Sequence, residues 1–212
     1  MLKRCTEITI NEEFEVILVN NGSTDNTHEI LEQLIPKYPG CSVVNVQENK
    51  GYGFGILAGL NSAKGKILAW THADMQTDPK DSLLGLDIFD KYGTDILVKG
   101  SRYGRPLGDT IFTVGMSIFE TLLLRKRMWD INAQPTMFSK DFYETWSSAP
   151  HDFSLDLFVY FKSLKDKKLV YRFPVKFGER AYGISHWNVD FKSKLKFIKR
   201  TISYSFKLRK MF

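Results

Sequence analysis

Short apolar runs alternate with longer amphipathic segments along the first hundred residues. The first run, from Phe14 to Val19, is rich in β-branched residues and ends in the turn sequence Asn20-Asn21-Gly22-Ser23. The same pattern predicts strands at 42–46, 66–70 and 95–99, and helices at 25–38, 51–63 and 79–92. Strands that alternate with helices at this spacing indicate βαβ units, and therefore an α/β fold with a mainly parallel sheet flanked by helices.

Polar residues or glycine follow each of these four predicted strands. The four segments are Asn20-Asn21-Gly22-Ser23, Glu48-Asn49-Lys50-Gly51, His72-Ala73-Asp74 and Gly100-Ser101-Arg102. In a parallel α/β sheet the ligand binds beyond the carboxyl ends of the strands. Loops are often polar, so each segment is a weak signal alone, but the four together predict one ligand site at this edge.

The regular alternation ends near residue 104. Beyond it we expect helices at 109–124 and 152–164 and strands at 135–139 and 168–175, within one domain that ends near residue 190. No stretch approaches eighteen uninterrupted apolar residues, and the best candidate, Ile111 to Leu124, contains Glu120. We therefore expect no membrane-spanning helix, and the start of the chain does not read as a secretory signal peptide.

The positive charge lies mostly in the last segment. The chain has 30 Lys and Arg against 24 Asp and Glu, yet residues 191–212 contain eight of the cations and no acid, so the remainder is slightly acidic. One helical face of the segment carries Phe191, Leu195, Ile198, Ile202 and Phe206. This pattern predicts a carboxyl-terminal basic amphipathic helix on an anionic membrane surface. The alternative is a helix packed on the body with a solvated basic face.

The remaining composition excludes other classes of protein. Two cysteines, Cys5 and Cys41, do not build a disulfide scaffold or a structural zinc site, and they fit a reducing compartment. The body lacks a basic stripe, which argues against a nucleic-acid partner. We expect a cytoplasmic protein, peripheral on the cytoplasmic face of a membrane.

The segment from Thr71 to Pro79 carries the sharpest chemical signal. Asp74 follows a buried strand and Gln76 adds an amide oxygen two residues later. Hard cations such as Mg²⁺ or Mn²⁺ prefer oxygen ligands of this kind, and such an ion would hold a diphosphate leaving group. The alternative is that both side chains decorate a turn. We assign Asp78 to capping of the next helix, because it precedes Pro79.

An ordered set of short strings covers nearly the whole chain. The strings are Val19 to Asp25, Asn49-Lys50-Gly51-Tyr52-Gly53, Ala73 to Pro79, Gly100-Ser101-Arg102, Asp130 with Gln134 to Phe138, and Arg180 through Gly183 to Ser185. No single string is decisive, but the ordered set resembles the inverting GT-A glycosyltransferases. It is most similar to the branch with polyprenyl-phosphate (dolichol-phosphate) mannose and glucose synthases. The resemblance implies a GT-A fold over residues 1–190, a GDP- or UDP-linked sugar donor, Mg²⁺ or Mn²⁺, and a polyprenyl-phosphate acceptor.

The resemblance also implies a role for each matching residue. On the donor side it places Asn20, Asn21, Asp25, Lys50 and Gly51 at the nucleotide, Asp74 and Gln76 at the metal, and Arg102 at the donor phosphates. It places Asp130 at the reaction centre, as the general base if the acceptor is a sugar hydroxyl, and Arg180 and Ser185 at the acceptor phosphate.

Three departures from the family pattern leave alternatives open. His72 and the pair Asn20-Asn21 stand where the family usually has acids. The family also has a central strand, a loop and most of a helix, roughly 20–25 residues, before the strand at Phe14. The segment from Met1 to Ile10 resembles the end of that helix, so we expect either an amino-terminally truncated domain or a domain that functions without that element. The alternatives are a transferase acting on a saccharide acceptor in polysaccharide assembly, and a non-catalytic sugar-nucleotide-binding relative.

Overall fold

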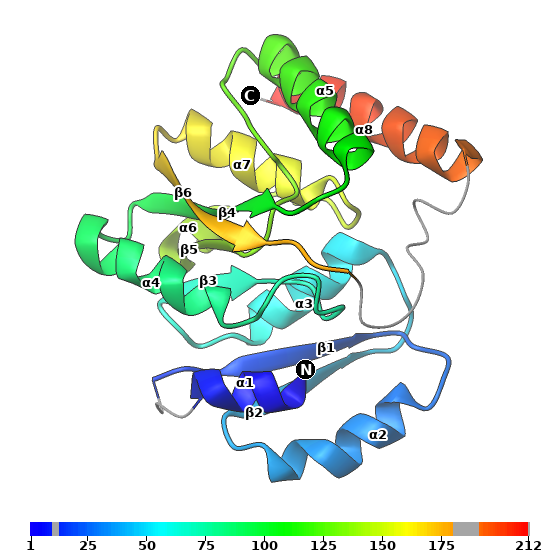
Figure 1. Ribbon diagram of the computed structural model, residues 1–212, viewed down its shortest axis with the longest axis vertical. Helices are drawn as coiled ribbons and strands as arrows, with labels where there is room; N and C mark the ends of the chain where they lie inside the picture. The colour runs from blue at the N-terminus through cyan, green and yellow to red at the C-terminus, as the bar shows by residue number, and fades with distance from the viewer. Residues whose placement is uncertain (10–12, 180–190, 212) are drawn as a thin grey trace.

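The computed structural model describes residues 1–9, 13–179 and 191–211 (Figure 1). Its strands are β1 (Val16–Asn21), β2 (Cys41–Val46), β3 (Ile67–Trp70), β4 (Ile96–Tyr103), β5 (Thr136–Ser139) and β6 (Leu169–Lys176). Its helices are α1 (Leu2–Thr9), α2 (Thr27–Leu34), the 3-10 turn η1 (Ile35–Lys37), α3 (Tyr52–Ser62), α4 (Asp81–Tyr92), α5 (Leu107–Leu124), α6 (Lys140–Glu144), α7 (Leu155–Lys165) and α8 (Phe191–Met211).

The strands form two sheets. β1 and β2 make a parallel pair, and the larger sheet has the order β3-β5-β4-β6. β5 runs antiparallel to both β3 and β4, whereas β4 and β6 are parallel over their full length. Helix α3 contacts both β1 and β3, so it bridges the two sheets.

Two apolar clusters cover the two faces of the larger sheet. One contains Trp70, Phe138 and Phe158 and includes most of α7, whose residues 155–163 are all buried. The other packs α4 against β4 and β6 through Phe89 and Phe173. The result is the layered α/β arrangement that the sequence pattern predicts.

The predicted elements are confirmed to within a few residues, with two differences. β4 continues to Tyr103 instead of ending at Lys99, because it pairs with β6 along all eight of its residues. Arg102 therefore lies inside a strand, close to its end, and not in a loop. The short helix α6 was not predicted; it begins after β5 at Ser139, whose hydroxyl accepts a hydrogen bond from the Phe142 N–H at 3.3 Å.

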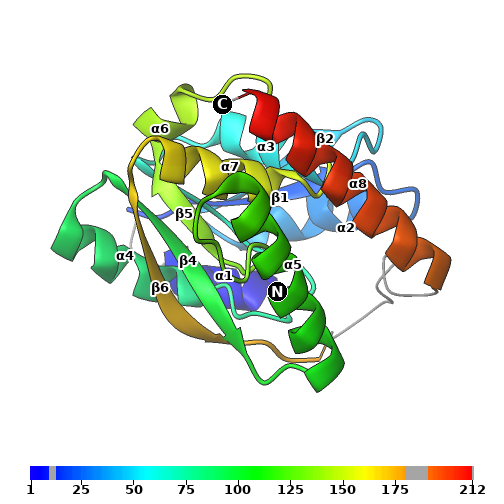
Figure 2. The same cartoon turned by 90° about the horizontal axis from the view of Figure 1, so that it is seen from above.

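Helices α5 and α8 lie side by side at one end of the molecule (Figures 1 and 2). By length and composition alone, α5 is apolar enough to cross a membrane. This differs from our expectation that the chain has no such helix. Core helices of soluble proteins can also be this long and this apolar. Only 17% of its residues are buried, so it is not a core helix. It contains two acids, Asp109 and Glu120; Glu120 is fully buried and accepts a hydrogen bond from the Ser205 hydroxyl of α8 at 2.6 Å.

The apolar face predicted for the last helix is divided between the body and the surface. Ser205 and Leu208 are the fully buried residues of α8 among those described. Leu195 and Phe206, from the predicted apolar face, are each 49% exposed. The helix is therefore packed on α5 and still presents apolar side chains outward.

The buried carboxyl at the α5–α8 contact predicts a pH-dependent stability. Burial raises the pKa of Glu120 from 4.5 to about 7, and the Ser205 hydrogen bond offsets only part of this rise. Between these two pKa values the folded state keeps a proton that the unfolded state has lost. The free energy of unfolding therefore falls as the pH rises through this range, and this contribution no longer changes at higher pH. The full difference is about 3 kcal/mol.

Glu120→Gln should remove this part of the pH dependence, because an amide does not titrate. The measurement is urea denaturation of wild type and variant at about pH 5 and pH 8, with the exposed Glu144→Gln as the matched control. An unchanged slope in the Glu120 variant would assign the pH dependence to another group.

Candidate functional site

Asn20 and Asn21 close β1, and they have different surroundings. Asn20 is buried; its Nδ2 donates to Asn45 Oδ1 at 3.1 Å and its Oδ1 accepts from the Ser23 N–H at 3.2 Å. It therefore ties β1 to β2 and to the turn. Asn21 Nδ2 donates to the Gly51 carbonyl at 3.1 Å, while its Oδ1 is buried without a hydrogen-bond partner among the described residues. Asn21 is thus the better placed of the two for recognition.

The next predicted residues surround Asn21 or lie further out. Gly51 has a φ of +117°, and a Cβ there would stand 2.4 Å from the His151 carbonyl oxygen, so only glycine fits. Lys50 is exposed and stands 5.5 Å from the centre of the Phe54 ring. Asp25 is exposed, and hydrogen bonds from Thr27 hold its pKa below the usual range. Asp25 therefore fixes the start of α2 and remains accessible.

The loop after β3 holds the predicted metal ligands in one tight turn. Asp74 Oδ1 accepts the Gln76 N–H at 3.1 Å, and Met75 between them has a φ of +60°. Gln76 is anchored to the end of β6, since its Nε2 donates to the Gly178 carbonyl at 3.3 Å and its carbonyl accepts the Gly178 N–H at 2.8 Å. The two candidate ligands are held close together by the backbone.

Asp78 has a different role from the one predicted. Helix α4 begins at Asp81, and the residue at its N-cap position is Lys80. Asp78 Oδ1 accepts the Lys80 N–H at 3.0 Å, and its Oδ2 pairs with Arg4 of α1 at 2.7 Å. Pro79 and Lys80 form a turn ahead of α4, and Asp78 stabilises that turn instead of capping the helix. Its ion pair with Arg4 also holds α1 in place.

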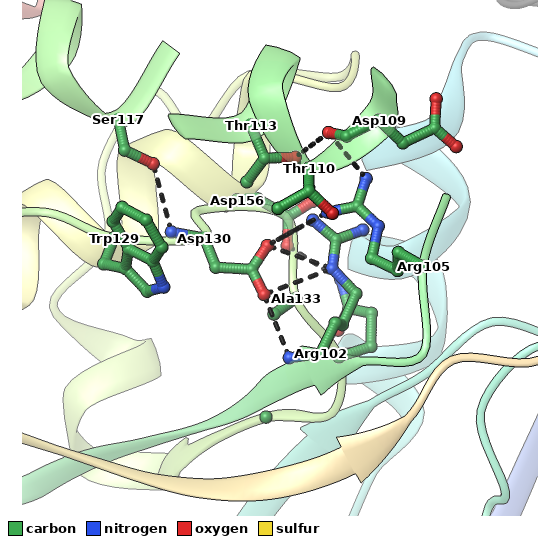
Figure 3. Close-up of polar contacts among 12 residues, drawn as sticks. Arg102, Arg105, Asp109, Thr110, Thr113, Ser117, Trp129, Asp130, Ala133 and Asp156 are labelled. Atoms are coloured by element: carbon green, nitrogen blue, oxygen red, sulfur yellow. Dashed lines mark hydrogen bonds and ion pairs between the residues drawn. The ribbon is translucent and has the colours of Figure 1, made fainter. Parts of the chain in front are cut away.

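Arg102 and Asp130 form the central ion pair of the site (Figure 3). Arg102 Nε donates to Asp130 Oδ1 at 3.0 Å, its Nη2 donates to the same oxygen, and its backbone N–H donates to Oδ2 at 3.1 Å. The Asp130 N–H in turn donates to Ser117 Oγ of α5 at 3.1 Å. Asp130 has a φ of +41°, an uncommon conformation that this network maintains.

The ion pair changes what Asp130 is suited to do. Its burial would raise the carboxyl pKa, but the hydrogen bonds and charge of Arg102 outweigh burial and hold the pKa below its usual range. A carboxylate with a lowered pKa that is already paired is a weak general base near neutral pH. The geometry therefore favours Asp130 as the group that orients Arg102, and its base role for a sugar-hydroxyl acceptor stays a prediction.

A second guanidinium stands beside this pair, and sequence reasoning missed it. Arg105 Nη1 lies 3.9 Å from Asp130 Oδ1 and donates to Thr113 Oγ1 of α5 at 2.8 Å. Both arginines also lie against the ring of Phe177, at 5.3 and 5.5 Å. Two guanidinium groups therefore lie around the Asp130 carboxylate. The string Arg102 to Arg105 contains the signal, but only the fold shows that both side chains converge.

A buried polar network below the edge was also missed. Lys99 is fully buried; its Nζ donates to Thr136 Oγ1 and lies 3.9 Å from Asp156 Oδ1, and burial lowers its pKa to about 7. Gln134 Nε2 joins Asp156 to the Tyr52 hydroxyl, at 2.8 and 3.3 Å.

The Tyr52 ring connects this network to the predicted metal loop, since it lies 5.6 Å from the ring of His72. His72 therefore packs against an aromatic ring. Arg180 and Ser185, the predicted acceptor-phosphate residues, lie outside the described residues.

The metal loop is compatible with a hard cation only if other ligands join it. Asp74 provides one carboxylate and Gln76 one amide oxygen, and the described residues contain no group of three or more His, Cys, Asp or Glu side chains that could hold a metal ion. Mg²⁺ and Mn²⁺ are commonly bound by one or two carboxylates together with phosphate and water oxygens. The donor set therefore fits an ion that arrives with a diphosphate.

A sequence profile described as glycosyl transferase family 2 matches residues 1–166. The chain belongs to glycosyl transferase family 2. Among curated relatives it is 36% identical over 75 residues to the undecaprenyl-phosphate 4-deoxy-4-formamido-L-arabinose transferase of Edwardsiella ictaluri, and 38% identical over 69 residues to a dolichyl-phosphate beta-glucosyltransferase of Trichomonas vaginalis. These matches cover 34% and 32% of this family 2 chain and only 23% and 20% of the relatives.

Solved structures with a similar fold match almost the whole chain. A mannosyltransferase of Pyrobaculum calidifontis in complex with GDP-Man and Mn²⁺ matches 97% of the chain and 60% of its own, with a TM-score of 0.64 and 16% identity. A glucosyl-3-phosphoglycerate synthase of Mycobacterium tuberculosis in complex with Mn²⁺, UDP-glucose and phosphoglyceric acid matches 91% and 68%, with a TM-score of 0.65 and 16% identity. The family 2 chain therefore has the GT-A fold, as the sequence predicted.

Proposed function

We propose that the protein is an inverting glycosyltransferase that moves a sugar from a GDP- or UDP-linked donor to a polyprenyl phosphate. The observation that carries the proposal is the arrangement of one edge of the sheets. Asn21 and His72 line one cavity there, Asp74 stands two residues beyond His72, and Arg102 and Arg105 converge from the end of β4. The names of the curated relatives support the acceptor class, and the ligands of the solved structures support the donor class.

Asp74 and Gln76 would hold Mg²⁺ or Mn²⁺, which supplies charge neutralisation for the departing diphosphate. Arg102 would add a second positive charge. Asp130 would hold the Arg102 guanidinium in a fixed orientation, so that the guanidinium does not have to reorganise during the reaction. A polyprenyl phosphate is ionised near neutral pH, so this acceptor needs positioning more than deprotonation. Asp130, the predicted base, is already paired with Arg102, which suits a phosphate acceptor better than a sugar hydroxyl.

The binding test is calorimetry of GDP and UDP with and without Mn²⁺. Asp74→Ala should lose the Mn²⁺-dependent part of the affinity, roughly tenfold or more, because the chain's one predicted carboxylate ligand is gone. Asp87→Ala, an exposed carboxylate on α4, is the matched control and should bind as wild type does. A folded wild-type protein that binds neither nucleotide would support the non-catalytic alternative and contradict the proposal.

We further propose that α5 and α8 together hold the protein on the membrane that contains the acceptor. Leu107, Ile111, Ile118 and Leu122 fall on one face of α5 and are 54% to 75% exposed. Exposed cations adjoin this face, at Arg125 and Arg127 after α5 and at Lys207, Arg209 and Lys210 on α8. An apolar stripe bordered by cations fits an anionic bilayer surface, and α5 supplies apolar area that the sequence had assigned to residues 191–212.

The membrane prediction is tested by flotation with vesicles that contain anionic lipid. The double variant Ile118→Ser/Leu122→Ser should weaken vesicle binding by roughly tenfold or more, since two exposed aliphatic side chains no longer enter the interface. Leu84→Ser, at a residue of α4 that is 53% exposed, is the matched control and should bind normally. A wild-type protein without affinity for the vesicles would favour a soluble saccharide acceptor.

A further inference from the structure

A small cavity lies between α5, α7 and α8, beside the Arg102–Asp130 pair. Helix α5 contributes Glu120 to its lining, α7 contributes Leu157 and α8 contributes Thr201. Arg102 lines the cavity as well, so the cavity adjoins the candidate site. Its volume is about 50 Å³. We call it the Glu120 cavity.

Two hydrogen bonds join the lining of this cavity to the residues of the site. Ser117 Oγ accepts the Asp130 N–H at 3.1 Å, and Thr113 Oγ1 accepts from Arg105 at 2.8 Å. Asn132, also in the lining, stands two residues beyond Asp130. The cavity and the ion pair are therefore held in one position relative to each other.

Glu120 has one carboxyl oxygen that is paired and one that is not. Its side chain is fully buried, and its Oε1 accepts from the Ser205 hydroxyl, whereas Oε2 has no hydrogen-bond partner among the described residues. A protonated Oε2 would leave a donor unpaired and an ionised carboxylate would leave a charge poorly paired, and both are costly in a buried place. Because Glu120 lines a cavity with room for another group, we expect its missing partner in a bound molecule.

The size and charges of the cavity favour a small neutral group. A water-sized group needs roughly 10–15 Å³ of such space, so the cavity admits a few heavy atoms and not a whole sugar ring. Arg102 in the lining disfavours a cation, and the Glu120 carboxyl disfavours an anion. A hydroxyl both donates and accepts hydrogen bonds, so it can pair with Oε2 in either protonation state. The rings of Phe112 and Phe153 supply apolar surface for a carbon atom that carries the hydroxyl.

We propose that the Glu120 cavity binds the hydroxymethyl group of the transferred sugar, with Glu120 as the residue that recognises its hydroxyl. This inference rests on the proposed function, which places Arg102 at the donor diphosphate. The sugar is bonded to that diphosphate, so it lies next to Arg102 and extends one substituent into the cavity. The protein therefore selects hexosyl donors with a hydroxymethyl group over pentosyl and 6-deoxyhexosyl donors.

The affinity for matched pairs of nucleotide sugars tests the proposal without requiring transfer. The pairs are UDP-glucose with UDP-xylose, which lacks the hydroxymethyl group, and GDP-mannose with GDP-D-rhamnose, which lacks only the 6-hydroxyl. In calorimetry with Mn²⁺, the wild type should bind the hydroxymethyl sugar roughly tenfold or more tightly than its analogue, because the analogue leaves Glu120 Oε2 unpaired. Free UDP and GDP are measured alongside.

Two variants at position 120 assign the selectivity to this residue. Glu120→Leu should bind both members of a pair with similar affinity and should bind the free nucleotide as wild type does, because the nucleotide lies outside the cavity. Glu120→Gln should keep most of the preference, since an amide still pairs with a hydroxyl. The matched control is Glu144→Leu, at an exposed residue of α6, which should keep the full preference.

Two results would overturn the proposal and leave the proposed function standing. Equal affinity of the wild type for both members of a pair whose free nucleotide binds would leave the cavity to ordered water. A full preference in a folded Glu120→Leu variant would remove the role of Glu120. Failure of both free nucleotides to bind would overturn the proposed function, and this inference with it. If circular dichroism shows that Glu120→Leu does not fold, the wild-type pairs and Glu120→Gln still decide.

Discussion

Arg102→Ala should lower the rate of sugar transfer by roughly 10²–10³-fold, the usual loss when one charge-stabilising donor is removed from an active site. The guanidinium donates to Asp130 Oδ1 through Nε and Nη2, and the Arg102 backbone N–H donates to Asp130 Oδ2, so the orientation of the guanidinium is fixed before any substrate arrives. Arg102→Lys should recover little of the rate, because an ammonium group cannot reproduce the paired hydrogen bonds that Nε and Nη2 donate to Asp130. The measurement is single-turnover transfer with a saturating donor.

Asp130→Asn separates orientation from base catalysis. If Asp130 orients Arg102, the variant should retain part of the rate and keep the wild-type pH profile, since the amide still accepts a hydrogen bond. If Asp130 were the general base, the acidic limb of the pH profile would disappear together with the rate. The exposed Lys37→Ala is the matched control for loss of a positive charge and should transfer normally.

The Arg102 variants require a stability control, because their ion pair is almost completely buried. Removal of one partner of a buried pair costs about 3–5 kcal/mol in other proteins. Each variant should therefore be assayed well below its unfolding midpoint. A variant that is folded, binds donor as wild type does and transfers at the wild-type rate would contradict the role given to Arg102.

Lys99→Met should destabilise the folded protein by about 3–5 kcal/mol, the loss expected when one partner of a buried ion pair is removed. Lys99 is fully buried between Thr136 and Asp156, and Asp156 is also buried. Burial raises the pKa of Asp156, and Lys99 is the charge that opposes this rise most. Without Lys99 the Asp156 carboxyl would have to remain protonated or stay charged with no cation beside it.

The double variant Lys99→Met/Asp156→Asn tests this explanation. It should be more stable than Lys99→Met alone, because the uncompensated carboxylate is gone and Gln134 keeps a hydrogen-bond partner. Urea denaturation of the two single variants and the double variant gives the coupling energy. Additive losses would show that the two groups do not compensate each other.

The order and type of the elements could be predicted from the sequence, with the short helix α6 as the exception. The helices and strands follow from apolar periodicity, which depends on neighbours a few residues apart, and predicted boundaries such as 51–63 for α3 differ from the structure by one residue. The ordered strings, read together, were enough to place the chain in glycosyl transferase family 2 and to predict its GT-A fold.

Tertiary structure alone decided the electrostatics of the site. Arg102 and Asp130 are 28 residues apart, and no periodic pattern links them. The lowered pKa of Asp130 and the burial of Lys99 arise from the way β4, β5 and α7 pack, because desolvation and charge pairing depend on distance in space and not along the chain. For the same reason only the fold shows that the apolar face of α5 is exposed.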